Sequence, residues 1–516
     1  MKKKIWILLL AALTLGAGAC TKPLENNGQE QGQQGQTGEE PGLDEETLKV
    51  YEYVNTFAFN RMNVYYLWQA EIAKDLEAWK ETDEPIEKVR KIRYKDSTGK
   101  DIDKWTMVTD DYASFYSSVA GNEKTAGFDF TFYFLDSTHK SLCAVITFVY
   151  PGSPADKAGI KRGDTIIQVN GKTIPYPDYT PSYYTLIGGD KFTVGLYGSD
   201  KTITIEPVEM YENPVLLTKV FDNGTKKVGY LHYTSFTLDS CTELIKVCSD
   251  FKDAGISELI VDLRYNSGGF SLTEQAIASL IGPEDAVNDH RVLSTEVFNS
   301  KLTEYYASRG EDISTYFQTE YDFTSGGKNY KFSTAGANVG VKRLYFIIGS
   351  GSASASEALI GELSAYMDVV IIGEQSHGKY CSGLMMQAEE FFEENASQLG
   401  SVRTAAGKKY AKNWGLYVMY SRFADKNGKT LCMPDGIVPE YEVDDDPLDG
   451  YKLGDPGETM LAKALSLCGY KTKAQAARTA DDRQTRLQLE EAPIRTDELR
   501  PGSGMRIILP QQAGLR

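Results

Sequence analysis

The chain is poor in positive charge and in histidine. Its 516 residues carry 55 Lys and Arg against 72 Asp and Glu, a net charge of −17, with no basic stripe to offset it. Such a chain repels phosphate backbones, so we expect no nucleic-acid partner. None of the four histidines is followed by an evident aspartate partner motif, which weighs against a serine–histidine pair. The four are His139, His232, His290 and His377.

Cysteine is scarce as well. Apart from Cys20, the six cysteines are scattered along the chain and lack the paired short spacings of a zinc site, so we expect no metal and no cofactor. Cys241 and Cys248 lie seven positions apart in a predicted helix. The rise of about 1.5 Å per residue separates them too far for a disulfide, and we predict that they are not bridged.

The N-terminal apolar run, Ile5 to Leu15, is too short for a membrane-spanning helix of about 20 residues. Lysines precede it, and a small-residue zone ending at Cys20 follows. This arrangement resembles a bacterial lipoprotein signal, which implies a signal peptide over 1–19 and lipidation of Cys20; an ordinary secretory signal is the alternative. We therefore expect a lipid-anchored, extracytoplasmic protein of the bacterial cell envelope, joined to its membrane through that anchor.

The length of the chain favours several domains. Residues 20–46 are rich in Gln, Gly and Glu and predict a disordered tether. Apolar spacings near the helical period predict a small helical region over 47–125. We expect a β-rich domain over 126–210 and an α/β core over 226–442, with an insertion at about 289–339. For 443–516 we predict a final helix and a loosely ordered tail.

A string of turn signals marks the β-rich domain. Pro154 starts a short helix, Gly159 ends it, and Asn170-Gly171 predicts a tight hairpin. In this order the signals resemble a PDZ domain of the bacterial protease type; another small β module is the alternative. The resemblance implies a peptide-binding loop at Gly127, Phe128, Asp129 and Phe130, which holds the carboxylate of a chain end. The charge of Asp129 opposes a carboxylate there.

The run from Gly351 to Glu357 follows an apolar strand pattern and opens a helical one. A sharp strand-to-helix turn presents a serine hydroxyl beside the unpaired amides of the first helical turn, where they can hold an oxyanion. We expect the serine to be presented and not buried. The alternative is a capping box, in which Ser354 and Glu357 satisfy each other's backbone donors.

Two further loops are predicted at the same sheet edge. One runs from Asp262 to Gly269 and the other from Gly373 to Lys379, each after a predicted strand. Loops at the carboxyl ends of parallel strands meet at one edge, where sites form. A desolvated lysine is neutral near pH 7 and can activate a serine, so Lys379 is a candidate base; an exposed surface charge is the alternative.

The order of these motifs resembles the C-terminal processing peptidases, also called tail-specific proteases, over about 128–442. The resemblance implies a crotonase-like α/β core with a mixed or parallel sheet and crossover helices, beside the PDZ domain and the helical region. It also implies Ser354 as the nucleophile over Ser352 and Ser356, with Lys379 as general base. The implied oxyanion donors are the amides of Ala355 and of Gly268 or Gly269.

One position departs from that family. The family often has a glutamine four residues after the lysine to orient it, and Gly383 stands there. Ser382 or Gln387 could substitute, or packing alone could hold the lysine. We expect a serine endopeptidase that acts on polypeptides captured by a free C-terminal end. The alternative is a catalytically weak, peptide-binding lipoprotein on a peptidase scaffold.

Overall fold

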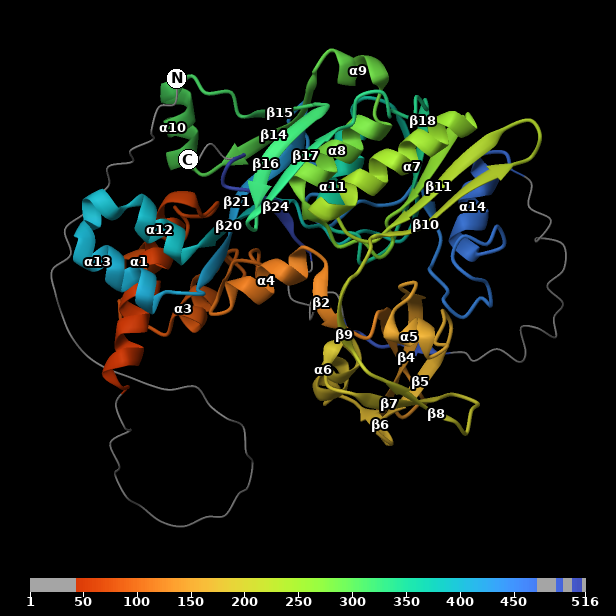
Figure 1. The fold of residues 1–516 in the computed structure, drawn as a ribbon, viewed down its shortest axis with the longest axis horizontal. Helices are drawn as coiled ribbons and strands as arrows, with labels where there is room; N and C mark the ends of the chain where they lie inside the picture. The colour runs from red at the N-terminus through yellow and green to blue at the C-terminus, as the bar shows by residue number, and fades with distance from the viewer. Residues whose placement is uncertain (1–42, 471–488, 495–503, 513–516) are drawn as a thin grey trace, which may run out of the picture.

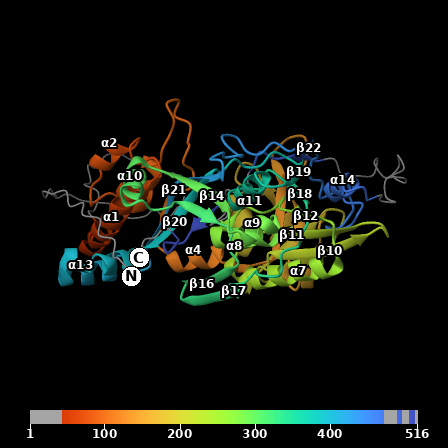
Figure 2. The same cartoon turned by 90° about the horizontal axis from the view of Figure 1, so that it is seen from above.

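The computed structural model describes residues 43–470, 489–494 and 504–512. The predicted signal peptide, the predicted lipidation site Cys20 and most of the predicted tether lie outside these residues. The tether ends earlier than expected, because the first helix already begins at Glu45, where the Asp44 side chain caps it. Figure 1 shows a helical end, a β-rich lobe and an α/β core, and Figure 2 shows the helical end and the core from above.

The helical end combines two distant parts of the chain. The first helix packs against two helices that follow residue 387, and Figure 1 shows them side by side. Phe57 and Phe391 contribute to the apolar core between them. The elements are α1 (Glu45–Tyr65), α2 (Ala73–Glu77), α3 (Pro85–Ile92), β1 (Met107–Thr109), α4 (Tyr112–Val119), β2 (Asn122–Thr125), α12 (Ala388–Glu394) and α13 (Ala396–Tyr410).

The β-rich lobe has the order of elements that the turn signals predicted. Alternate residues of its first strand are buried, and residues 170 and 171 both have positive φ at the tight hairpin. That strand lies between β4 and a segment from the C-terminal tail. The elements are β3 (Phe128–Phe134), β4 (Ser141–Val149), α5 (Pro154–Lys157), β5 (Thr165–Val169), β6 (Lys172–Pro175), α6 (Thr180–Gly188), β7 (Phe192–Leu196), β8 (Thr202–Ile205) and β9 (Val208–Tyr211).

The α/β core contains a six-stranded sheet in the order β10-β11-β12-β18-β19-β22. The neighbours from β11 to β19 pair in parallel, which confirms the predicted parallel arrangement. One face packs on α7, α8 and α11, and the other on α14. The elements are β10 (Val215–Asp222), β11 (Lys227–Tyr233), η1 (Leu238–Ser240), α7 (Cys241–Ala254), β12 (Glu258–Asp262), α8 (Ser271–Ile281), β18 (Arg343–Ile348), α11 (Ala355–Ser364), β19 (Asp368–Gly373), β22 (Tyr441–Glu442) and α14 (Thr459–Leu467).

A second, mixed sheet crosses the core in the order β13-β24-β20-β21-β14-β15. The prediction of an insertion at 289–339 is wrong in part, because β14 pairs along β21 as a strand of this sheet. Its elements and their neighbours are β13 (Gly269–Phe270), α9 (Glu284–Asn288), β14 (Val292–Phe298), α10 (Ser300–Arg309), β15 (Ser314–Tyr316), β16 (Glu320–Ser325), β17 (Lys328–Ser333), β20 (Cys381–Gln387), β21 (Gly415–Asp425) and β24 (Arg506–Ile508).

The C-terminal tail contributes strands to both parts of the molecule. The predicted final helix is α14, but a loosely ordered tail is wrong for the two segments that the structure describes beyond residue 470. The strand β23 (Glu490–Glu491) pairs antiparallel with β3, and β24 lies between β13 and β20. Arg506 of β24 is buried and forms ion pairs with Glu274 and Glu296. The strand β24 is therefore part of the folded core.

Candidate active site

Ser354 stands where β18 turns into α11, in a backbone conformation that few side chains adopt. Its φ is 62° and its ψ is −108°, outside the main allowed regions for an L-residue. Such strain is typical of a nucleophile on a sharp strand-to-helix turn. The expected exposure is wrong, because the residue is completely buried. The capping box that the sequence offers is present, since Glu357 reaches back to the Ser354 N–H. The Ser354 Oγ has no well-formed hydrogen bond to a described residue.

Glu357 ties the serine turn to the lysine loop. Its Oε2 accepts the N–H of Ser354 at 2.8 Å and that of Lys379 at 2.9 Å. Its Oε1 accepts the hydroxyl of Ser376 at 2.5 Å and the N–H of Gly378 at 2.6 Å. Burial raises the pKa of Glu357 to about 7, although the four donors act in the opposite direction. One carboxylate therefore fixes the backbone of both candidate catalytic residues.

Lys379 is completely buried, which excludes the alternative of a surface lysine. Its Nζ lies 5.0 Å from the ring centre of Trp105 and 5.2 Å from that of Tyr417, and it donates a hydrogen bond to the Tyr417 hydroxyl at 3.1 Å. Desolvation lowers the pKa of Lys379 from 10.5 to about 7. A large fraction of the amine is therefore neutral near pH 7, as a general base requires.

The serine and the lysine do not hydrogen-bond to each other in this structure, because the Ser354 Oγ has no partner and the lysine amine faces Tyr417. The hydrogen bond that a working serine–lysine pair requires is therefore not formed here. Catalytic hydrogen bonds often tighten only when substrate is bound.

The glycine loop after β12 meets the serine turn, as the parallel sheet predicts. The Asn266 carbonyl accepts the N–H of Ala353 at 3.1 Å and the hydroxyl of Ser356 at 2.9 Å. A Cβ on Gly268, whose φ is +115°, would lie 3.1 Å from the Ser354 Cβ. A side chain at position 268 would therefore meet the serine. All three predicted loops come together at the carboxyl edge of the sheet.

The predicted oxyanion donors differ in whether their N–H groups already donate a hydrogen bond within the protein. The Gly268 N–H donates to the side-chain oxygen of Asn266 at 2.9 Å, and the Gly269 N–H donates to the Met505 carbonyl at 2.5 Å. Ala355 is the first residue of α11, where backbone N–H groups have no partner within the helix. The Gly269 amide can reach an oxyanion only if the Met505 carbonyl moves away.

Comparison with known proteins agrees with this geometry. Residues 227–443 match the sequence profile of peptidase family S41, and residues 145–187 match that of a PDZ domain. The carboxy-terminal processing protease CtpA of Bacillus subtilis (strain 168) is 28% identical over 382 residues, 70% of each chain. A carboxyl-terminal-processing protease of Picosynechococcus sp. is 26% identical over 235 residues, 44% of this chain and 49% of that protein.

These matches support a C-terminal processing peptidase family for the chain. It is a serine-type peptidase. A crystal structure of a Bacteroides fragilis protein assigned to the S41 proteases aligns with a TM-score of 0.59 at 20% identity, over 81% of this chain and 98% of that one. That likeness supports the S41 peptidase fold with mixed sheets.

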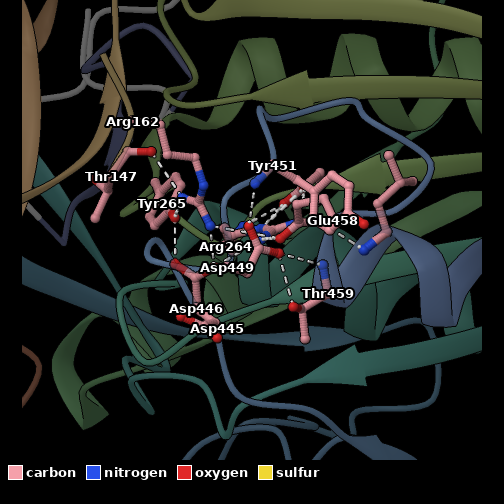
Figure 3. A network of polar contacts seen from close by, with 12 residues as sticks. Thr147, Arg162, Arg264, Tyr265, Asp445, Asp446, Asp449, Tyr451, Glu458 and Thr459 are labelled. Atoms are coloured by element: carbon pink, nitrogen blue, oxygen red, sulfur yellow. Dashed lines mark hydrogen bonds and ion pairs between the residues drawn. The ribbon is translucent and has the colours of Figure 1, made fainter. Parts of the chain in front are cut away.

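An ion network, shown in Figure 3, joins the two domains of this C-terminal processing peptidase. Arg162 of the PDZ lobe donates to the Tyr265 hydroxyl at 2.6 Å and to Asp445 at 2.8 Å. Arg264 donates to the same carboxylate at 2.9 Å and to Glu458 at 2.6 Å. Burial opposes ionisation of Asp445, but the two arginines hold its pKa well below its usual range. Sequence reasoning missed this network, since its partners are far apart along the chain.

A cavity of about 390 Å³ connects the PDZ lobe to the catalytic loops. Its wall includes the predicted peptide-binding residues Phe128 and Phe130 and the glycines 268 and 269. Gly127 lies at the start of that loop with a φ of +81°, and a Cβ there would lie 2.1 Å from that of Ser153. Ser354 and Lys379 do not line this cavity. The cavity thus brings the predicted peptide groove and the predicted oxyanion loop to one space.

The remaining sequence predictions have mixed outcomes. The six described cysteines are free and buried, which confirms that Cys241 and Cys248 are not bridged. The hydroxyl of Ser382 accepts a hydrogen bond from Arg506, and the side chain of Lys379 bonds to Tyr417 instead. The contact of Tyr417 with Lys379 was missed, and no local sequence signal marks it.

Proposed function

We propose that this serine-type peptidase is an endopeptidase with a Ser354–Lys379 dyad. The observation that supports it best is the buried lysine, whose pKa is lowered to about 7, in a loop that Glu357 ties to the serine turn. Desolvation of a lysine is a known way to prepare a base for a serine nucleophile. The parallel sheet with helices on both faces also supports the crotonase-like description of the core.

In the proposed mechanism the neutral Lys379 amine takes the proton of the Ser354 hydroxyl while Oγ bonds to the scissile carbonyl carbon. The amide of Ala355, with that of Gly268 or Gly269, stabilises the oxyanion. The lysine ammonium then protonates the leaving amine as the C–N bond breaks. Water, deprotonated by the same lysine, attacks the acyl-enzyme and releases the new carboxyl end together with the free serine hydroxyl.

The dyad is tested by kinetics on a quenched fluorescent peptide. We expect Ser354→Ala and Lys379→Ala to abolish cleavage, and Ser401→Ala, an exposed serine of α13, to leave kcat/KM unchanged. Retained cleavage by Ser354→Ala would exclude it as the nucleophile.

We further infer that the PDZ lobe captures the free C-terminal end of a polypeptide through the loop at Gly127, Phe128 and Phe130. The cavity shared by this loop and the catalytic loops supports it. Backbone amides of such a loop hold a terminal carboxylate. A substrate with a free C-terminus should therefore show a lower KM than the same peptide with a C-terminal amide. Equal KM values for the two peptides would show that the PDZ lobe does not capture substrates by their C-terminal carboxylate.

We also propose that the mature protein is a lipoprotein that begins at Cys20 and lies in the bacterial cell envelope outside the cytoplasm. The lysines, the apolar run and the small residues before Cys20 support this proposal. Among the described residues, no helix is long and apolar enough to cross a membrane. Mass spectrometry of the N-terminal peptide should find acyl groups on Cys20, and an unmodified N-terminus at another residue would contradict the proposal.

A catalytically weak peptide-binding protein is the second candidate. The missing serine–lysine hydrogen bond and the Met505 carbonyl on the Gly269 amide favour it. If the intact protein binds a peptide saturably and does not cleave it, this second function is supported over the first.

A further inference from the structure

Gly383 leaves a space that another side chain fills. It lies on β20, four residues after the candidate base, where related enzymes often carry a glutamine that orients the lysine. A Cβ on Gly383 would lie 2.3 Å from Cζ and 2.7 Å from the hydroxyl oxygen of Tyr417. The two positions are diagonal neighbours on one face of paired strands, since Gly383 pairs with Met419 of β21. The phenol thus occupies the volume of the side chain that Gly383 lacks.

The hydrogen bonds of the Tyr417 hydroxyl determine that it accepts from Lys379 and does not donate to it. Its hydroxyl donates its only proton to the Arg506 carbonyl at 3.2 Å and accepts from the lysine Nζ at 3.1 Å. Burial raises the pKa of Tyr417 well above its ordinary value, so the phenol stays protonated. Because the phenol oxygen accepts from a fixed direction, one N–H of the lysine points at that oxygen and the lone pair of the amine is free to face elsewhere.

We propose that Tyr417 is the positioning residue of Lys379 in this enzyme, and that Gly383 is the position that makes room for it. This inference rests on the proposed dyad. The ring of Tyr417 and that of Trp105 also face the amine, so they stabilise the ammonium that forms when the lysine takes the serine proton. Substrate binding then has to bring the free lone pair toward Ser354 without releasing the phenol.

The test compares Tyr417→Phe with Tyr420→Phe. Tyr420 is a matched control, since it is buried on the same strand and its hydroxyl bonds to that of Tyr306. We expect Tyr417→Phe to lower kcat by roughly 10- to 100-fold at unchanged KM, part of the ~10²–10⁴-fold that a positioned base contributes. We expect Tyr420→Phe to keep its kcat.

The pH profile separates positioning from a structural role. A hydrogen bond to the phenol favours the charged lysine over the neutral one, so its loss should move the acid limb of kcat/KM to lower pH. A wild-type kcat and acid limb in Tyr417→Phe, alongside an inactive Ser354→Ala, would overturn the inference and leave the dyad intact. Activity retained by Ser354→Ala would instead overturn the dyad itself.

If Tyr417→Phe does not fold, a rescue variant tests the same positioning role. The double variant Gly383→Gln with Tyr417→Ala exchanges the phenol for an amide that reaches from the other strand. It should exceed the kcat of Tyr417→Ala alone at least tenfold, whereas Gly383→Gln alone should clash with the ring and lose activity. No gain in the double variant would contradict the positioning role.

A separate observation concerns the tail segment 489–494, which lies in the PDZ groove. Glu490 and Glu491 pair antiparallel with the edge strand β3, and the Ala492 N–H donates to the Phe132 carbonyl at 3.0 Å. Ala492 and Ile494 are buried in the apolar core of the lobe. The segment therefore runs toward the peptide-binding loop at Gly127, in the direction of a chain end that adds to a sheet edge.

We propose that the segment 489–494 is an internal ligand of the PDZ groove, which a substrate end must displace. It pairs with the backbone of the strand that a bound peptide would use, and its Ile494 and Ala492 line the shared cavity. Because the ligand belongs to the same chain, it competes at a high effective concentration.

The test uses the Ser354→Ala protein and a fluorescent peptide of the sequence Leu-Glu-Glu-Ala-Pro-Ile. We expect the protein with intact tail to exclude the peptide, and Ala492→Glu with Ile494→Glu to bind it at least tenfold more tightly. The matched control Glu490→Gln with Glu491→Gln changes two exposed side chains of the segment and should still exclude the peptide. Equal peptide affinity in the intact and the tail-released protein would overturn the proposal, whether or not the enzyme cleaves substrates.

Discussion

Glu357 accepts the backbone N–H of Lys379 at 2.9 Å with the same carboxylate oxygen that accepts the N–H of Ser354. One buried side chain therefore holds together the backbones of the two proposed catalytic residues. A capping glutamate at the third position of a helix usually serves its own helix. Here it also holds a loop that begins after another strand.

Glu357→Gln should lower kcat by about 100-fold, because a displacement of about 1 Å can cost that much. The amide nitrogen cannot accept the N–H groups that one oxygen now accepts. Kinetics and urea unfolding measure the effect, and the free energy of unfolding should fall by about 2 to 4 kcal/mol. The exposed Glu440→Gln is the control. An unchanged kcat would show that the carboxylate does not hold the two loops in register.

The activity should depend on pH through the lysine. The pKa of Lys379 is lowered by burial to about 7, so kcat/KM should rise with pH and level off above that value. A stopped assay from pH 5 to 9 measures the profile. An activity that stays constant from pH 5 to 8 would show that no group with this pKa serves as base.

Lys379→Met should give an inactive protein that is more stable than the wild type at pH 7. The unfolded lysine binds a proton up to pH 10.5, whereas the buried amine releases it near pH 7. Between these values the unfolded state binds more protons, so this residue lowers stability as pH falls from 10.5 to about 7. We expect a gain of a few kcal/mol at pH 7 that shrinks toward pH 10.

Urea unfolding at several pH values measures this gain, with the exposed Lys412→Met as control. A less stable Lys379→Met protein at pH 7 would mean that the amine is charged in the folded state.

Arg162→Leu should destabilise the protein by about 3 to 5 kcal/mol, because it leaves the buried Asp445 with one arginine fewer. The exposed Arg309→Leu loses a surface pair with Glu311 and a contact with the Tyr305 ring, and it should change stability by less than about 1 kcal/mol. Chemical unfolding followed by fluorescence measures both. Equal stability of the two variants would show that Arg162 does not compensate a buried charge.

Short-range features of the fold and the site could be predicted from the sequence. The hairpin at Asn170-Gly171 and the alternating strand from Phe128 depend on local backbone preferences, and the convergence of three loops follows from parallel strands. Ser354 and Lys379 became candidates because each lies in a loop that follows a strand pattern, and the family resemblance selected them within those loops.

Long-range packing accounts for what was missed. Arg506 looks like a surface residue of a polar tail, and its burial depends on carboxylates more than two hundred residues away. Tyr417 is one of many aromatic residues, and only pairing of β20 with β21 places it on Gly383. The burial of Ser354 could not be foreseen for the same reason, since the glycine loop that packs beside it comes from another strand.

Peptide mapping after reaction with a fluorophosphonate probe tests the central claim most directly. Such a probe forms a bond only with a serine whose hydroxyl is activated by a base. The account predicts that Ser354 alone carries the label in the wild type, that labelling increases as pH rises through about 7, and that Lys379→Met abolishes it. A label on another serine, or equal labelling of Ser354 in Lys379→Met, would contradict the serine–lysine dyad.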